Sequence, residues 1–245
     1  MILTSKNNPL IKETAALKEK KGRKEQGLFI VEGRKMLSEC LQSEFEIERI
    51  FLSEEQEDLF LPEEKIVRVS DDIMRFLSDE KTPQGVLCTV KLPKRELCPP
   101  VGKCLFLDGV ADPGNVGAII RTANAAGYKE VYMTTECADP YSPKSVRASM
   151  SGVFFTKIYR GERKELLSLF DGPLLVADMA GENVFKTSPL DKFVLAIGNE
   201  ANGISQETFE RATKKIAIPM AATQESLNAA VSAGILMYLL SDFNK

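Results

Sequence analysis

The chain has 245 residues, of which 44% are hydrophobic and 27% are charged, and its formal net charge is −3. It contains no histidine, which excludes Ser-His-Asp and Cys-His catalysis, imidazole metal sites and the usual proton shuttle near pH 7. This composition is typical of a soluble globular protein with one or two domains.

The five cysteines, Cys40, Cys88, Cys98, Cys104 and Cys137, show no Cys-x-x-Cys spacing. An odd number of thiols without a secretory signal fits reduced cytosolic cysteines better than a disulfide framework. The first residues lack the apolar stretch of a signal peptide, and no apolar run reaches the roughly 18 residues that a membrane span needs. We therefore expect a cytoplasmic protein that does not cross a membrane.

Charge is distributed unevenly along the chain. Residues 1–35 carry nine Lys or Arg against four Glu, whereas residues 44–80 carry thirteen acidic side chains against four basic ones. The N-terminal cations can follow a phosphate backbone, and the candidates for RNA contact there are Lys18, Lys21, Arg23 and Lys24. The alternative interpretation is a solvated helix face with interspersed glutamates.

The first part of the chain alternates short apolar runs with helical stretches. The pattern predicts strands over residues 27–31, 47–52, 66–69 and 85–90, and helices over residues 34–43 and 71–78. Residues 91–103 hold three prolines and show little periodicity, which is typical of a linker. We therefore predict a small α/β domain over residues 1–95, a linker over 96–102 and a second domain over 103–245.

The second domain repeats strand and helix more strongly. Strands are expected over residues 104–107, 130–134, 153–158, 174–177, 193–197 and 215–218, and helices over 116–126, 163–170, 207–213 and 224–242. Several of these strands are continuous apolar runs without alternation. Such runs are typical of parallel strands that are covered on both faces, so the fold class is α/β.

The first informative loop, PGNVGAIIRTA, begins after the strand that ends near Asp108. Asn115 can cap the following helix, and Arg121 lies about one and a half turns inside it. The alternative is an ordinary capped helix with a surface arginine. A dinucleotide site is disfavoured because the loop lacks the GxGxxG spacing.

The second loop, IGNEANGIS, follows an apolar strand directly. Ligands bind at the carboxyl ends of the strands in open parallel sheets. Gly198 permits a close backbone approach there, and Glu200 places a carboxylate beside it. The alternative is a strand-to-helix turn in which Asn202 and Gly203 supply the bend.

In the third loop a strand ends near Pro219, and Ser226 and Asn228 stand before a helix that is rich in Ala, Ser and Gly. The alternative is a terminal helix capped by Ser226. Ser226 is not expected to act as an acyl nucleophile, because the chain has no histidine to serve as its base.

Together these three loops resemble, in order and spacing, the signature motifs of the SpoU/TrmH-type RNA ribose 2′-O-methyltransferases of the SPOUT superfamily. The resemblance covers residues 105–240 and includes the stretch 142–154 between the first two motifs. The segments EGRKMLSECL and TPQGVL resemble the small substrate-binding domain that precedes many such catalytic domains. One departure is Pro83, which stands where relatives often have histidine.

The resemblance implies a parallel sheet whose C-terminal segment forms a deep trefoil knot, and a homodimer through the knot helices. It implies S-adenosylmethionine as cosubstrate, without a metal, held by Gly198, Ile218 and Leu227 with Met220 as a neighbour. The substrate is RNA, with 23S-type ribosomal RNA favoured over tRNA because of the N-terminal domain. Lys144 and Arg147 add to the expected RNA contacts.

The resemblance also assigns roles in methyl transfer to a ribose 2′-hydroxyl. Arg121 takes the central position, and we favour phosphate anchoring and charge stabilisation over a base role because a guanidinium offers no acceptor. Glu200 would orient Arg121 or the substrate, while Asn115, Ser226 and Asn228 would fix the ribose and the loops. The alternatives are a tRNA methyltransferase, a non-catalytic RNA-binding protein of the same fold, and a small-molecule α/β enzyme.

Overall fold

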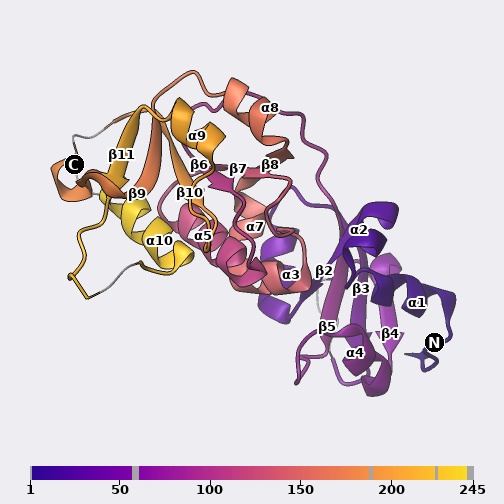
Figure 1. Ribbon diagram of the computed structural model, residues 1–245. Coiled ribbons are helices and arrows are strands. Elements are labelled where there is room, and N and C mark those ends of the chain that lie inside the picture. The colour runs from indigo at the N-terminus through magenta and orange to yellow at the C-terminus, as the bar shows by residue number, and fades with distance from the viewer. Residues whose placement is uncertain (1, 57–60, 188–189, 224–225, 242–245) are drawn as a thin grey trace. The chain divides into compact units, whose positions relative to one another are not determined.

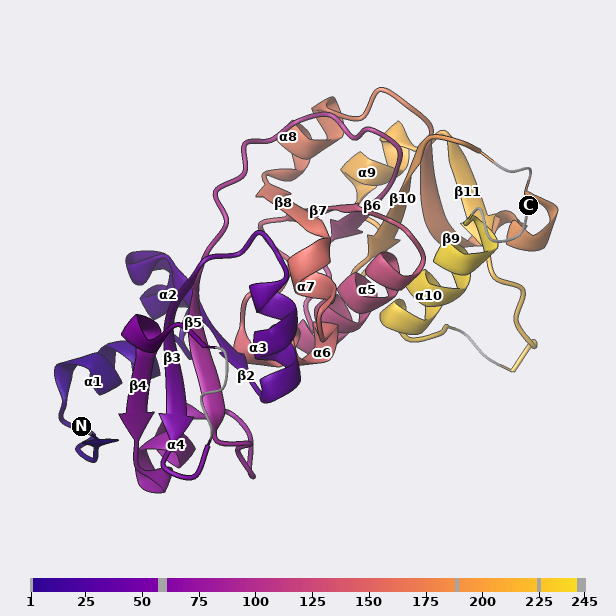
Figure 2. The same cartoon turned by 180° about the vertical axis from the view of Figure 1, so that it is seen from behind.

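The computed structural model describes residues 2–56, 61–187, 190–223 and 226–241. The chain divides into two compact units, one of residues 1–94 with 139–154 and the other of residues 95–138 with 155–245. Figures 1 and 2 show the elements of each unit from opposite sides. Among the described helices, none is long and apolar enough to cross a membrane.

The first unit is built on a mixed sheet with the strand order β1-β4-β3-β5-β2. β1 and β3 run parallel to β4, whereas β5 runs antiparallel to β3 and β2. Its strands are β1 (Ile2–Leu3), β2 (Leu28–Glu32), β3 (Ile47–Ser53), β4 (Ile66–Val69) and β5 (Val86–Lys91). Its helices are α1 (Pro9–Ala16), α2 (Lys20–Gln26), α3 (Arg34–Leu41), η1 (Glu63–Lys65), α4 (Asp71–Leu77) and α6 (Pro143–Ser149).

Residues 139–154 belong to this first unit, although the sequence pattern placed them inside the second domain. Aromatic contacts and the ion pairs Arg23–Asp139 and Arg147–Asp79 hold them there. The ring of Tyr141 lies 5.0 Å from that of Phe29, and the ring of Phe154 lies 5.6 Å from that of Phe45. These contacts join residues more than a hundred positions apart, which explains why local pattern did not find them.

The second unit contains a sheet of six parallel strands, counted over the described residues, in the order β11-β9-β10-β6-β7-β8. The strands are β6 (Lys103–Asp108), β7 (Glu130–Thr134), β8 (Lys157–Gly161), β9 (Leu174–Asn183), β10 (Phe193–Gly198) and β11 (Lys214–Ala217). The helices are α5 (Pro113–Ala125), α8 (Arg163–Ser168), η2 (Val184–Lys186), α9 (Gln206–Arg211) and α10 (Ala229–Leu239). The predicted parallel α/β fold is thereby confirmed.

Helices cover both faces of this parallel sheet. α8 and α9 lie on one face and α5 and α10 on the other (Figure 1). Phe106, Tyr132, Leu166 and Phe170 form part of the buried core on the first face. Because both faces are covered, β6 and β10 are continuous apolar runs, as the sequence indicated.

Two predicted elements differ from the structure. The apolar run expected as a strand over 153–158 forms a helical turn, α7 (Gly152–Phe155), and the strand β8 starts only at Lys157. A short buried apolar run fits helix and strand equally well. The C-terminal helix starts at Ala229, where the Asn228 side chain accepts from the amides of Ala230 and Val231, and the predicted limits near 224 and 242 lie outside the described residues.

Candidate functional site

Two loops of the second unit start side by side at the carboxyl end of the sheet. Asp108 and Gly198, the last residues of β6 and β10, are paired in register. The loop after β10 closes on itself, because Asn199 and Gly203 exchange backbone hydrogen bonds of 2.8 and 2.9 Å. The Asn199 side-chain amide also donates to the Gly109 carbonyl over 2.7 Å and so joins the two loops.

Gly198 is needed by the fold of this loop. A Cβ atom at this position would lie 2.3 Å from the carbonyl carbon of Gly203 and 2.5 Å from the amide nitrogen of Ile204. Both neighbours are backbone atoms that cannot yield cheaply. The close approach that the sequence indicated at Gly198 is therefore made by the protein's own backbone.

A hydrogen-bonded network links the three motif loops. Asn115 Nδ2 donates to Glu200 Oε1 over 2.8 Å, and Asn228 Nδ2 donates to Asn115 Oδ1 over 3.0 Å. The Glu200 carboxylate also accepts from the amides of Ala111 and Asp112 at 3.1 and 3.4 Å. Burial raises the pKa of Glu200, but these hydrogen bonds outweigh it and hold the pKa below its ordinary value.

Arg121 lies apart from this network. It follows Asn115 by six residues on α5, which places it about 240° further around the helix. Its side chain is exposed, and it makes no hydrogen bond or ion pair with any part of the chain that the structure describes. The structure therefore brings together Asn115, Glu200 and Asn228 and leaves Arg121 outside the group.

A buried carboxylate fixes the far end of the loop after β10. Asp108 Oδ2 accepts from the Ser205 amide (2.9 Å) and hydroxyl (2.7 Å), and Oδ1 accepts from Arg163 Nε at 2.7 Å. Ser205 in turn caps α9. Burial raises the pKa of Asp108, but the hydrogen bonds from Ser205 and Arg163 lower it by more than burial raises it. The pKa of Asp108 therefore lies below its ordinary value.

An open crevice lies beside the network, between the middle of β9 and the carboxyl end of β10. It encloses about 810 Å³, and Glu200, Ser226 and Asn228 are among its lining residues. A smaller hollow adjoins it and shares Ala177, Asp178, Met179, Ser226, Leu227 and Ser232. Of the residues that the resemblance gave for the cosubstrate, Gly198 lines the crevice, Ile218 and Met220 line the hollow, and Leu227 lines both.

Asp178 and Ser232 also line both spaces and were missed by the sequence interpretation. Asp178 Oδ1 accepts from the Ala180 amide at 2.8 Å, and the side chain is half-buried. The signal was present, because Asp178 follows the apolar run 174–177 and the carboxyl ends of parallel strands form ligand sites.

Comparison with known proteins identifies the family to which the chain with this site belongs. The family model described as the SpoU rRNA Methylase family matches residues 102–238. The chain belongs to this family. It is accordingly an RNA ribose 2′-O-methyltransferase of the SpoU type. A second family model, the MRM3-like substrate binding domain, matches residues 8–88.

Relatives of this SpoU protein align over nearly their full length. An uncharacterized tRNA/rRNA methyltransferase of Synechocystis is 30% identical, with 96% of this chain and 92% of the relative covered. The 23S rRNA (guanosine(2553)-2′-O)-methyltransferase RlmP of Bacillus subtilis is 29% identical, with 97% and 98% covered. The crystal structure of an AdoMet-bound rRNA methyltransferase from Sinorhizobium meliloti is 27% identical, covers 98% of this chain and 97% of its own, and superimposes with a TM-score of 0.87.

Two of the cations expected to contact RNA in the substrate-binding domain make contacts within the protein. Arg23 is only 4% exposed, pairs with Asp139 over 2.6 Å and donates to the carbonyls of Leu17 and Lys18. Lys18 Nζ donates to the carbonyls of Phe76 and Ser78 at the end of α4. The cationic group of Arg23 is therefore buried and bound within the protein, and that of Lys18 is partly used there, so RNA contact by these two residues stays a prediction.

The other four expected cations are exposed. Lys24 makes no ion pair with the residues that the structure describes, Lys21 faces Glu25 at 3.8 Å, and Arg147 pairs with Asp79 at 3.1 Å. Pro83 is half-buried in the segment before β5. Among the residues that the structure describes, no cluster of Cys, Asp or Glu has the arrangement of a metal site.

Proposed function

We propose that this SpoU methyltransferase transfers the methyl group of S-adenosylmethionine to a ribose 2′-hydroxyl of large-subunit ribosomal RNA. The observation that carries the proposal is the crevice between the middle of β9 and the carboxyl end of β10, which opens beside the network of Asn115, Glu200 and Asn228. The Bacillus subtilis relative is named a 23S rRNA methyltransferase, and the Sinorhizobium meliloti structure is described as AdoMet-bound.

The crevice suits a molecule with an apolar body and several polar groups. Ile197, Ile204 and Leu227 supply apolar wall, and Asp178, Ser226 and Ser232 are polar. The volume lies within the about 300–1,000 Å³ that is usual for sites of drug-sized ligands. We assign the cosubstrate to Gly198, Ile218, Leu227 and Met220, with Asp178 as an acceptor for its hydroxyl or amino groups.

The reaction requires the ribose oxygen to be held in line with the methyl group. When bound, S-adenosylmethionine supplies an electrophilic sulfonium methyl group. Glu200 and Asn228 fix Asn115 at the rim of the crevice, where its amide positions the ribose. Arg121 has no partner among the described residues, and its guanidinium anchors the phosphate of the incoming nucleotide. Ser226, which lines the crevice, completes the positioning of the ribose.

We further propose a homodimer through α10. Val231 and Tyr238 on this helix are 50% and 45% exposed, while Leu236 and Met237 are buried against the sheet. An exposed apolar helix face is typical of a protein interface. We also propose that the C-terminal segment forms the trefoil knot that the resemblance implies.

The five cysteines are free thiols, and four of them are buried, which supports a reducing, cytoplasmic environment.

Two experiments test the proposal. Mapping of ribose methylation across total RNA, with and without the gene, is expected to show one lost site in large-subunit ribosomal RNA, whereas a lost tRNA site would establish the tRNA alternative. Calorimetric titration with S-adenosylmethionine is expected to show binding. A protein that binds RNA and fails to bind S-adenosylmethionine would be the non-catalytic alternative.

A further inference from the structure

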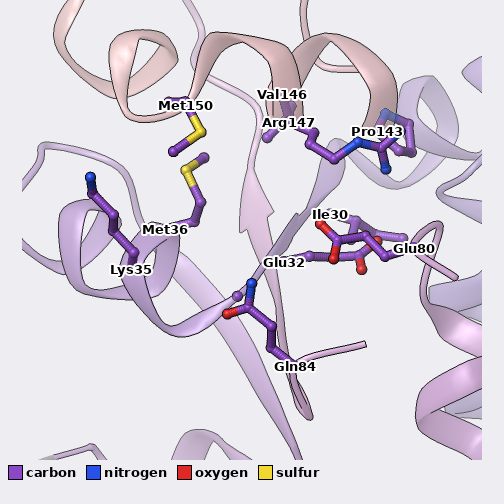
Figure 3. A pocket seen from close by; sticks show the side chains of 11 residues that line it. Ile30, Glu32, Lys35, Met36, Glu80, Gln84, Pro143, Val146, Arg147 and Met150 are labelled. Atoms are coloured by element: carbon purple, nitrogen blue, oxygen red, sulfur yellow. The ribbon is translucent and has the colours of Figure 1, made fainter. Parts of the chain in front are cut away.

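The first unit contains a pocket of its own, partly open to solvent. It holds about 200 Å³ and lies between β2, α3, the segment before β5, and α6. Figure 3 shows Met36 and Met150 pointing toward one another across it, with Gln84 reaching in from the segment before β5. Its volume is below the about 300–1,000 Å³ of sites for drug-sized ligands, so its occupant is a smaller fragment.

One part of the pocket wall is apolar and adaptable. It consists of Ile30, Met36, Pro143, Val146 and Met150, and the other side chains that line the pocket are polar or charged. Thioethers pack favourably against aromatic rings and are common on binding surfaces. Met150 has φ 49° and ψ −138°, and it is the one non-glycine residue with positive φ among the described residues. A strained backbone of this kind persists only where the surrounding structure fixes it, and it is common at active sites and ligand-binding sites.

Polar side chains line the same pocket without internal partners. Lys35, Glu80 and Gln84 make no side-chain hydrogen bond or ion pair with the described part of the chain. Glu32, in contrast, accepts from the Ser78 hydroxyl and the Asp79 amide, so its oxygens are already used. The pocket therefore offers a carboxylate acceptor at Glu80, an amide with donor and acceptor at Gln84, and a cation at Lys35, beside the Arg147 guanidinium that pairs with Asp79.

We propose that this pocket binds a single unstacked nucleobase of the RNA substrate. The apolar walls would cover the faces of the ring, and Glu80 and Gln84 would meet its polar edge, as protein sites for splayed-out RNA bases do. The Glu80 carboxylate only accepts hydrogen bonds, so it favours a base with an exocyclic amino group and repels a phosphate. Lys35 lies at the rim, where it meets the adjoining phosphate.

This inference rests on the proposed function only in taking RNA as the substrate, and it can be tested apart from catalysis. The full-length protein is labelled with carbon-13 in its methionine methyl groups and titrated with the four ribonucleoside 5′-monophosphates, with inorganic phosphate as the control. The methyl signals of Met36 and Met150 are expected to shift saturably with GMP, at an affinity on the order of 1 mM. UMP, which lacks an amino group, is expected to bind about tenfold more weakly.

Glu80→Gln is expected to weaken GMP binding about tenfold. Glu64→Gln, which changes an exposed carboxylate of the same unit outside the pocket, is expected to leave GMP binding unchanged. The inference is overturned if no nucleotide shifts Met36 and Met150, if phosphate alone shifts them equally, or if Glu80→Gln binds GMP like the unchanged protein.

The same sample separates this inference from the proposed function. Met179 lines the crevice of the second unit and Met220 lines the adjoining hollow, and their signals are expected to respond to S-adenosylmethionine. If they respond while Met36 and Met150 ignore all nucleotides, the nucleobase pocket fails and the proposed function stands. If they do not respond, the proposed function fails whatever the nucleotides do.

Discussion

The side-chain amide of Asn115 donates a hydrogen bond to the Glu200 carboxylate over 2.8 Å, which ties the first turn of α5 to the loop after β10. The same amide accepts from Asn228 at the start of α10. Three segments that are up to 113 residues apart thus meet at one carboxamide. Asn115 therefore fixes the rim of the crevice in the position at which we place the ribose.

Replacement of Asn115 tests this arrangement. Asn115→Asp places a second carboxylate against Glu200 and removes the amide N–H that donates to Glu200. We therefore expect a loss of about 1–3 kcal/mol in the free energy of unfolding. Methyl transfer is expected to fall at least about tenfold. The matched control is Asn124→Asp on the same helix, at a position outside the network. Urea unfolding and methylation rates measure both effects, and wild-type values for Asn115→Asp would contradict the account.

Arg121→Ala separates binding of the cosubstrate from transfer. The guanidinium is exposed and outside the crevice, so the affinity for S-adenosylmethionine is expected to stay within about twofold of the wild-type value. Methyl transfer is expected to fall by about 10²–10³-fold, the usual effect of removing one stabilising group from a transition state. Calorimetry and a tritium-transfer assay measure the two quantities. Normal turnover would remove Arg121 from the mechanism.

Gly198→Ala tests the closed loop after β10. The new Cβ atom would overlap the backbone of Gly203, so we expect a destabilisation of about 1–3 kcal/mol together with weaker binding of S-adenosylmethionine. Gly102→Ala is the control, because a Cβ there meets nothing within 4 Å. Thermal unfolding compares the two variants. Equal stability would show that the loop can open without cost.

Arg23 and Lys24 are adjacent in sequence and are expected to behave differently. Arg23→Met removes a buried guanidinium and leaves the half-buried Asp139 carboxylate without its ion-pair partner, so we expect a loss of about 3–5 kcal/mol in unfolding free energy. Lys24→Met is expected to change stability by less than about 0.5 kcal/mol, and Lys24→Glu to weaken RNA binding and lower its salt dependence. Urea unfolding and filter binding at several salt concentrations measure these effects. RNA binding that does not change in Lys24→Glu removes Lys24 from the RNA surface.

The free energy of unfolding is expected to depend on pH through the Asp108 carboxylate. Its pKa is lower in the folded protein than in the unfolded chain, so its contribution is complete above the ordinary pKa of about 4 and is lost as the pH falls through the folded value. Asp108→Asn is expected to be less stable at pH 7, with a difference that shrinks below about pH 4. Urea midpoints between pH 3 and pH 7 provide the measurement. A difference that stays constant with pH would contradict the prediction.

Much of the fold of the second unit could be predicted from the sequence, because its parallel strands are apolar on both faces. β10 and residues 104–107 of β6 appear in the sequence as uninterrupted hydrophobic runs. α2 appeared in the sequence only as the alternative of a solvated helix face, since its seven residues carry no apolar stripe and the tertiary contact of Arg23 is with Asp139, 116 residues away. The run that forms α7 was assigned to a strand because its length and burial fit both structures.

The candidate site was predictable as a list of residues but not as an arrangement. The motifs gave Asn115, Glu200 and Asn228, yet only the structure shows that Asn115 lies between the other two. The burial of Arg23 depends on Asp139, which is 116 residues away and leaves no local signal. Charge along a sequence therefore identified a basic segment without showing which of its cations face the solvent.

The central claim is that the crevice beside Asn115, Glu200 and Asn228 holds the methyl donor. A crystal structure of the protein soaked with S-adenosylmethionine tests it most directly. We predict electron density for the donor between Gly198, Ile218 and Leu227, with its methyl group directed toward the rim at Asn115. Density for the donor at another place on the protein, or a crevice closed by its own side chains, would contradict the account.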